Sequence, residues 1–376
     1  MFAPFRAVAS FRPTAAPALL AGASAVAGMF ASTTFLIPVV AERFGISVGT
    51  AGLISVVQVG GFTVATFLAG RRLRASRRIL VGAAFALIAA NLASAAIGWF
   101  WLLLIARLVA GVGAGLVTWL AWIDAMKERS VMKDVAGIGP LTALVAAPLF
   151  GVFTSLWGDR PVFLLLALLG SLPLAFRFEI EGVEVPARRR VSPSRSNLVL
   201  LVALALLTMA GSSLFIFTVA MAEARVGLDP AVASIAISAN SAAGLAGTRF
   251  RARPGTASLW MGGITVALAS LIAFPVAPVF YAAMIAWGFC FWMTVPEVLR
   301  QVAAWSLAPE ERVGDAQSLM ALGRVLGPGL GGLLVGVGSY VTVGIEAAAG
   351  TGVAMLIVGG VEYYRRSRPG PAGTAG

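Results

Sequence analysis

Residues 254–296 read PGTASLWMGGITVALASLIAFPVAPVFYAAMIAWGFCFWMTVP and contain no charged side chain. A helix needs about 20 apolar residues to cross a hydrocarbon core about 30 Å thick, so this run is long enough for two membrane spans. Pro275 and Pro278 mark the expected break between them, because proline interrupts helices and favours turns. The run therefore predicts two consecutive helices inside a membrane.

Similar uncharged runs, separated by short charged or Gly- and Pro-containing turns, fill most of the remaining sequence. Their lengths and apolar content predict an all-α integral membrane protein with twelve spans. We expect these spans at residues 17–40, 48–70, 79–98, 100–125, 135–156, 161–178, 198–221, 231–249, 257–277, 279–300, 315–337 and 341–363.

The composition agrees with this class. Hydrophobic residues make up 59% of the chain, charged residues only 12%, and the mean hydropathy is +0.92, which is too apolar for a solvated surface. The chain has no His and one cysteine, Cys290, so it lacks the usual ligand sets for zinc, haem and iron–sulfur centres. We therefore expect no metal or other cofactor.

The basic residues predict orientation rather than a nucleic-acid partner. The net charge is +12, but the arginines lie in loops between apolar segments and not on one face of a folded domain. With the N-terminus inside, 23 of the 28 Lys and Arg residues fall on the inner face, as the positive-inside rule requires. We expect both termini to be cytoplasmic and the chain to lie in a bacterial inner membrane.

A hydrophilic stretch, EIEGVEVPARRRVSPSRS at residues 179–196, lies midway along the chain. Its charge, Pro and Ser content is typical of a linker. We expect an N-terminal six-helix bundle at 1–178, a cytoplasmic linker at 179–197, and a C-terminal six-helix bundle with a short basic tail at 198–376.

The two halves repeat each other at corresponding positions. AERFGIS at 41–47 resembles EARVGLD at 223–229, and GRRLRA at 70–75 matches GTRFRA at 247–252. Ser47 and Asp229 are each placed to cap the helix that follows, with Pro230 in its first turn. The matches indicate two duplicated bundles in parallel orientation.

Two motifs in the first half resemble those of the major facilitator superfamily. RLVAGVGAG at 107–115 follows the pattern R-x-x-x-G-x-G-x-x of the family's fourth helix. The loop at 69–78 keeps the basic positions Arg74, Arg77 and Arg78 of G-x-x-x-D-R-x-G-R-R, although Leu73 replaces the Asp. The glycines of the fourth span have a physical reason as well, because small residues at this spacing let another helix backbone approach closely.

The Gly-rich pattern of the family's fifth helix, G-x8-G-x3-G-P-x2-G-G, appears in full on the eleventh expected span, from Gly314 to Gly332. Because it lies in the other half, it predicts a kinked, tightly packed helix but not export. The resemblance covers essentially the whole chain. It implies twelve helices in two six-helix bundles, with a central cavity lined by helices one, four, seven and ten.

That implied cavity supplies the candidate binding residues. Arg107 is the first of them, because an arginine two turns inside a span is functional by default; its alternative is a structural role between helices. The others are hydroxyl and indole side chains, for which bonding within the helix or a place in the interfacial belt is the alternative. They are Thr33, Thr34, Trp119, Trp122, Ser212, Ser213, Trp287 and Trp292.

Two carboxylates lie near the inner ends of spans. Asp124 on the fourth span and Glu297 on the tenth face the level of Arg-rich loops. Charge-assisted hydrogen bonds between such groups are strong, so we expect structural latches from Asp124 to Arg74 and from Glu297 to Arg251.

Two further charges lie deeper, Arg324 on the eleventh span and Glu346 on the twelfth. An unpaired charge at that depth is costly, so they form either a mutual pair or a coupling site. A proton-driven transporter needs a carboxylate that exchanges its proton, and the scarcity of buried carboxylates makes Glu346 the candidate.

These features predict a secondary active transporter that moves a small organic solute by alternating access. The chain has no G-x-x-x-x-G-K-[ST] nucleotide-binding loop, so we expect an ion gradient, most simply of protons, to supply the energy. The first span has no carboxylate and the deepest charges are arginines, which favours a neutral or anionic solute. The expected partners are this solute, the proton and the lipid bilayer, and we expect a monomer.

Two other classes of function are a membrane enzyme and a protein that has lost transport. A membrane enzyme needs a nucleophile–base pair or metal ligands, and a chain without His and with few buried carboxylates offers almost none. A transport-inactive sensor or partner-binding protein stays open, because Leu73 replaces the family's loop Asp.

Overall fold

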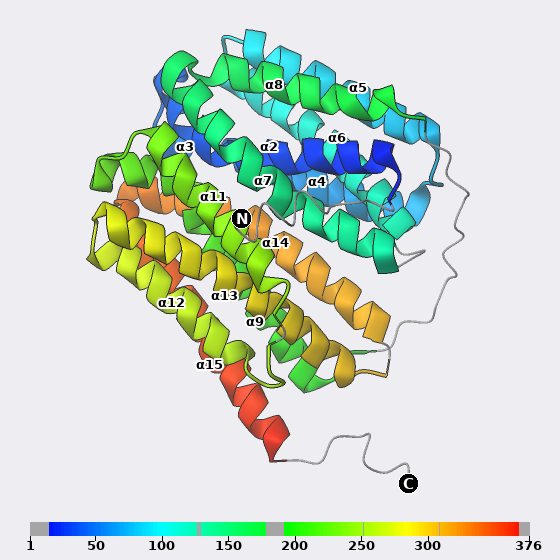
Figure 1. Ribbon diagram of the computed structural model, residues 1–376, viewed down its shortest axis with the longest axis vertical. Coiled ribbons are helices and arrows are strands. Elements are labelled where there is room, and N and C mark those ends of the chain that lie inside the picture. Colours follow the sequence, from blue (N-terminus) through cyan, green and yellow to red (C-terminus); the bar gives the residue numbers. More distant parts are fainter. Residues whose placement is uncertain (1–14, 126–128, 178–191, 251, 308, 368–376) are drawn as a thin grey trace, which may run out of the picture. The chain divides into compact units, whose positions relative to one another are not determined.

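The computed structural model describes residues 15–125, 129–177, 192–250, 252–307 and 309–367 (Figure 1). Within these ranges the chain forms helices and no strands. The helices are α2 (Pro17–Phe44), α3 (Val48–Ala51), α4 (Leu53–Arg72), α5 (Arg77–Ala96), α6 (Phe100–Ala125), α7 (Arg129–Trp157), α8 (Asp159–Ser171), the 3-10 turn η1 (Leu172–Ala175), α9 (Arg195–Phe215), α10 (Thr218–Met221), the π turn η2 (Ala222–Val226), α11 (Pro230–Gly247), α12 (Ala257–Ala273), α13 (Ala277–Ala304), α14 (Pro309–Val337) and α15 (Tyr340–Arg366).

Nine helical segments in the described part of the chain are long and apolar enough to cross a membrane. They coincide with nine expected spans, and α3 with α4 forms one of them. The three remaining expected spans fall on α8 with η1, on α11, and on α12, which has 17 residues. The all-α membrane class is confirmed, and the count of twelve crossings stays a prediction.

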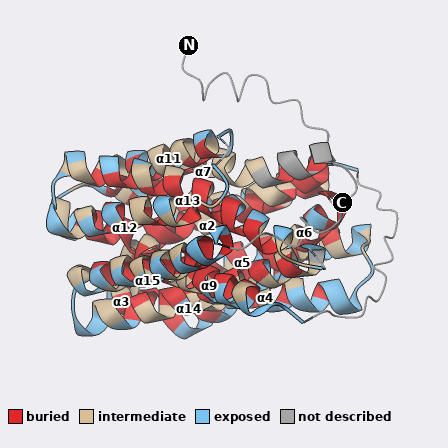
Figure 2. Cartoon of the chain, turned by 90° about the horizontal axis from the view of Figure 1, so that it is seen from below, coloured by how far each residue is buried: buried red, intermediate tan, exposed pale blue. Residues whose placement is uncertain are grey.

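Each long helix has a packed face and an outer face, visible as buried and exposed positions along one ribbon in Figure 2. The outer faces carry large apolar side chains, among them Phe85, Trp99 and Leu168, which are 59%, 65% and 62% exposed. A soluble protein avoids so much exposed apolar surface, whereas hydrocarbon solvates it.

The helix starts predicted from the repeat are confirmed. The Ser47 hydroxyl accepts a hydrogen bond of 3.0 Å from the Thr50 amide at the start of α3. Asp229 accepts one of 2.8 Å from the Ala231 amide at the start of α11, where Pro230 is the first residue. Both oxygens satisfy amides that have no partner within their own helix.

The chain divides into two compact units. Unit 1 comprises residues 1–185 and 216–242, and unit 2 comprises residues 186–215 and 243–376. In unit 1, α2 packs against α7, α8 and α6, while α5 packs against α6 and α8 and α4 against α6. In unit 2, α9 packs against α14 and α15, and α12 against α13 and α15.

These pairings correspond between the two units. The first expected span (α2) packs against the fifth (α7) and sixth (α8), and the seventh (α9) packs in the same way against the eleventh (α14) and twelfth (α15). Likewise, the third (α5) packs against the fourth (α6) and sixth (α8), and the ninth (α12) packs against the tenth (α13) and twelfth (α15). Residues 216–242, which include α10, η2 and most of α11, group with unit 1.

The glycines of the fourth span have the packing role that their spacing predicted. A Cβ atom at Gly111 would overlap the backbone carbonyl of Gln58 on α4, and one at Gly115 would lie 2.5 Å from the Phe62 carbonyl oxygen. From the other side, a Cβ at Gly61 would lie 2.7 Å from the Leu108 carbonyl oxygen. The backbones of α4 and α6 are therefore in direct contact along this seam.

Candidate functional site

A hydrogen bond in unit 2 joins two candidate site residues, Ser213 and Glu346, which both lie in membrane-spanning segments. Ser213, near the end of α9, donates a hydrogen bond of 2.5 Å from its hydroxyl to Oε2 of Glu346, near the start of α15. Ser213 is fully buried, whereas Glu346 is only partly buried. The hydroxyl also donates to the Ala210 carbonyl at 2.7 Å.

The predicted pair between Glu346 and Arg324 is not formed. Arg324 is exposed and has no hydrogen-bond or ion-pair partner among the residues that the structure describes. The reason is that the two residues lie at different heights along their neighbouring helices. Helix α14 ends at Val337 and α15 begins at Tyr340, so Arg324 lies at the level of Val353, seven residues or about 10 Å along the helix from Glu346.

Arg107 lies entirely inside unit 1. Its side chain is 0% exposed, and Nη2 donates to the Ala90 carbonyl at 3.1 Å and to Oδ1 of Asn91 at 2.9 Å, both on α5. The guanidinium carbon lies 4.9 Å from the centre of the Phe163 ring on α8. This arrangement agrees with the structural alternative for Arg107, because in this structure its side chain is enclosed by α5, α6 and α8.

The threonines of α2 are buried and bonded. Thr33 donates to the Met29 carbonyl at 3.2 Å and accepts from Nε2 of Gln58 at 3.5 Å. Thr34 accepts from the Val219 amide of α10 at 3.5 Å. Thr34 therefore joins the first expected span to the end of the seventh, a link between elements that the sequence did not predict.

Of the remaining binding candidates, Trp119 and Trp122 lie in unit 1, and Ser212, Trp287 and Trp292 lie in unit 2. Trp119 is buried beside Gly70 in unit 1, and Ser212 contacts α14 in unit 2 by donating to the Gly323 carbonyl at 3.5 Å. Trp122 is 42% exposed. Trp287 packs edge-on against Phe215, and Trp292 packs against Gly244.

Of the two expected inner latches, the one from Asp124 to Arg74 falls on described residues. No hydrogen bond or ion pair joins Asp124 to Arg74, because Arg74 lies in the turn after α4 and its side chain is exposed. Glu297 is latched to Arg300 on its own helix, at 2.8 and 2.5 Å, and to the Gly255 amide at 2.8 Å. Arg251, the predicted partner, lies outside the described residues.

A buried ion pair in unit 1 was missed by the sequence reasoning. Arg43 of α2 and Asp159 of α8 are 2.6 Å apart, with side chains 13% and 6% exposed. Arg43 also donates to the carbonyls of Ser94 and Ala95 in the last turn of α5 and of Ile97 just after it. The signal was available, since both residues lie at the same expected outer boundary, but only the fold decides that they face each other.

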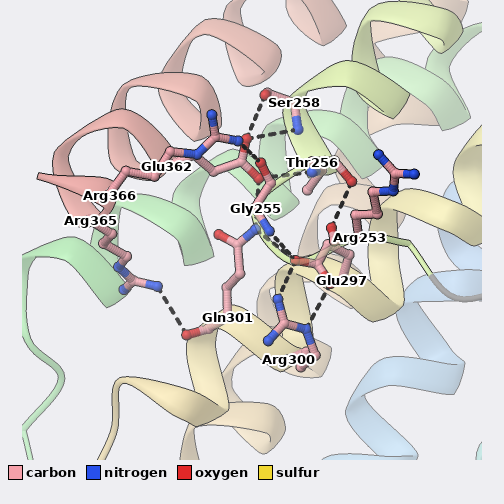
Figure 3. A network of polar contacts seen from close by, with 11 residues as sticks. Arg253, Gly255, Thr256, Ser258, Glu297, Arg300, Gln301, Glu362, Arg365 and Arg366 are labelled. Atoms are coloured by element: carbon pink, nitrogen blue, oxygen red, sulfur yellow. Dashed lines mark hydrogen bonds and ion pairs between the residues drawn. The ribbon is translucent and has the colours of Figure 1, made fainter. Parts of the chain in front are cut away.

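A polar network at the expected inner end of unit 2 was also missed (Figure 3). Glu362 of α15 accepts hydrogen bonds from the Ala257 amide at 2.8 Å, from the Ser258 hydroxyl at 2.5 Å and from Nε2 of Gln301 at 2.7 Å. Thr256, the residue before α12, makes no side-chain cap. A carboxylate from another helix therefore caps α12, where free amides and the helix dipole favour negative charge.

The network continues through Arg365 to α9. Arg365 donates to the Gln301 carbonyl at 3.0 Å and to Oδ1 of Asn197 at 2.8 Å, and it lies over the Trp305 ring at 4.8 Å. Asn197 in turn donates to the Val302 carbonyl at 3.2 Å. The expected inner ends of α9, α12, α13 and α15 are thus held by one set of contacts.

No group of three or more His, Cys, Asp or Glu side chains suited to a metal ion occurs within the described ranges. The polar groups inside the spans are instead single carboxylates, arginines, amides and hydroxyls, and several of them form hydrogen bonds between helices. Such groups can bind a solute or a proton by hydrogen bonds and charge.

Comparison with known proteins identifies the fold. The sequence model of the Major Facilitator Superfamily matches residues 18–332. No curated protein sequence matches the chain.

Solved structures of transporters share the architecture at low sequence identity. A bacterial homologue of the human lysosomal transporter Spinster, in an inward-facing and occupied conformation, has a TM-score of 0.70 at 13% identity, over 99% of this chain and 100% of the homologue. A POT family transporter in complex with a thioalcohol-conjugated peptide has a TM-score of 0.69 at 14% identity, over 93% of this chain and 96% of the other. A POT family transporter in complex with 5-aminolevulinic acid has a TM-score of 0.68 at 10% identity, over 93% of this chain and 94% of the other.

Proposed function

Because this chain belongs to the major facilitator superfamily, we propose that it is a secondary active transporter that moves a small organic solute across a bacterial inner membrane by alternating access. In this proposal two six-helix halves, 1–178 and 198–376, rock about a site near the middle of the membrane. Protons drive the cycle, and both termini are cytoplasmic.

The hydrogen bond between Ser213 and Glu346 carries the proposal of proton coupling. The Ser213 hydroxyl can donate to a carboxylate, as in the 2.5 Å contact, and can accept from a protonated acid, so it suits either charge state of Glu346. Glu346 is partly exposed and is not sealed in the helix packing. An acid inside a span that keeps a partner in both protonation states can exchange a proton during a cycle.

The exposed Arg324 supports an anionic group on the solute. It lies near the middle of α14 and has no partner in the described part of the chain. A charge at that depth is tolerated only when it faces protein or a water-filled cavity. A carboxylate or phosphate on the solute would supply the missing partner. Arg107 has no exposed surface, and we assign it to helix packing.

The solute must first be identified. The purified chain in detergent is screened with a panel of small carboxylates, phosphates and neutral solutes, because a ligand that binds the native state raises its melting temperature. Transport of a stabilising ligand is then measured in proteoliposomes with an imposed pH gradient. A ligand that binds but never crosses the membrane would favour the transport-inactive sensor instead.

The coupling group is tested with Glu346→Gln and the matched control Glu42→Gln. Glu42 is an exposed residue near the end of α2. Glu346→Gln should abolish proton-driven accumulation and leave solute exchange intact, since the amide cannot carry the proton. The control should accumulate normally. Normal accumulation by Glu346→Gln would exclude Glu346 and point to another ion or to uniport.

A further inference from the structure

A groove lies at the surface of unit 1, between the start of α5 and the turn η1. It has a volume of about 180 Å³ and is lined by Arg77, Leu80, Phe85, Pro173 and Phe176, among others. Phe85 and Phe176 are 59% and 42% exposed. The groove is thus apolar except at one end, where Arg77 begins α5.

Arg77 is the basic residue of the lining, and Arg74, Arg78 and Arg177 lie close to lining residues along the chain. All four arginines are exposed, and none forms an ion pair with another residue that the structure describes. Ser76 precedes α5 but makes no side-chain cap, so the first amides of the helix add to the positive potential. An anion at this end would meet a guanidinium and a helix N-terminus together.

The dimensions match those of a lipid that lies along the helix. Phe85 follows Arg77 by eight residues, which places it about 12 Å further along α5. Because α5 is long and apolar enough to span the membrane, Arg77 lies at the membrane surface and Phe85 in the hydrocarbon. A headgroup at Arg77 would therefore leave an acyl chain over Leu80 and Phe85.

We propose that this groove binds an anionic phospholipid of the surrounding leaflet, with its phosphate at Arg77 and one acyl chain against Leu80, Phe85 and Phe176. Basic pockets between spans on the cytoplasmic side are suited to anionic headgroups. A soluble phosphate compound fits less well, because most of the lining is apolar. The site is independent of the transported solute.

Native mass spectrometry of the purified full chain tests the proposal by counting bound phosphatidylglycerol and phosphatidylcholine at equal concentrations. Arg77→Ala should lower phosphatidylglycerol binding about fivefold, as expected for about 1 kcal/mol per basic residue near the membrane surface. Arg72→Ala, the matched control, removes an exposed arginine at the end of α4 that does not line the groove, and it should change binding less than twofold. Equal losses in both variants would show diffuse surface charge and overturn the site.

A second pair tests the acyl-chain contact without removing charge. Phe85→Ala should weaken binding of the lipid, whereas Leu92→Ala, which removes a 48% exposed side chain from the same helix beyond the groove, should not. Both side chains are exposed, so both variants should fold. Unchanged binding in Phe85→Ala, or displacement of the lipid by millimolar inorganic phosphate, would overturn the proposal.

Discussion

The seam between α4 and α6 gives a quantitative test of the packing. A Cβ atom at Gly61 would lie 2.7 Å from the Leu108 carbonyl oxygen and 3.3 Å from the Val112 amide nitrogen, whereas ordinary contact begins at 3.4 Å. The shortfall is about 0.7 Å, and both neighbouring atoms belong to backbone, which cannot rotate away. Gly61→Ala should therefore push the two helices apart and cost about 1–3 kcal/mol of stability, the usual range for overpacking.

The preceding residue supplies the control. A Cβ at Gly60 meets nothing within 4 Å, so Gly60→Ala changes helix propensity equally but creates no collision. A second pair repeats the test in unit 2: a Cβ at Gly327 of α14 would overlap the Met209 carbonyl oxygen of α9, and one at Gly336 meets open space.

The melting temperature of each purified variant is measured in detergent, with tryptophan fluorescence as the signal of unfolding. We expect Gly61→Ala and Gly327→Ala to melt below wild type, and Gly60→Ala and Gly336→Ala to match or exceed it. Equal melting temperatures for Gly60→Ala and Gly61→Ala would refute the close backbone contact.

Three further predictions follow from the described contacts. Asp159→Asn should destabilise the protein by about 3–5 kcal/mol, because it leaves Arg43 charged and buried; the double variant Arg43→Met/Asp159→Leu should melt closer to wild type, and a lower value for the double variant would contradict the argument. Arg107→Ala should lower the melting temperature, and Arg107→Lys should lower it less, because the 3.1 and 2.9 Å bonds to α5 need the guanidinium. Unchanged stability with lost solute binding would return Arg107 to the binding site. For topology, single cysteines at Ser76 and Ser192 should react with a membrane-impermeant reagent only from the cytoplasmic side, and ones at Gly98 and Val276 only from outside; labelling of Ser192→Cys from outside would reverse the orientation.

Much of the fold follows from local features of the chain. Each long uncharged run became a helix, because backbone groups in hydrocarbon must be bonded within the segment. Ser47 and Asp229 cap the helices that follow them, and the Gly111 and Gly115 spacing forms a helix contact, because these interactions involve neighbouring residues or one face of one helix.

The candidate site could be predicted only in part. Glu346 and Ser213 were identified as polar groups inside spans, but their hydrogen bond joins residues 133 positions apart. The pair of Glu346 with Arg324, one of the two alternatives that the sequence left open, is not formed in this structure, since pairing by adjacent spans ignored the depth of each residue. Arg107 was noted for its charge, and its bonding to Asn91 depends on how α5 is rotated toward α6.

Local patterns along the chain were enough to predict which segments are helices, that they belong in a membrane, and which positions carry unusual polar or small residues. Hydropathy, capping and helical spacing are properties of consecutive residues, so they can be read along the chain. The fold was needed to show that Glu362 caps α12, that Arg43 pairs with Asp159, and that Arg324 is exposed. Such partners depend on the rotation and depth of each helix, which are fixed by the packing of many side chains from distant parts of the chain.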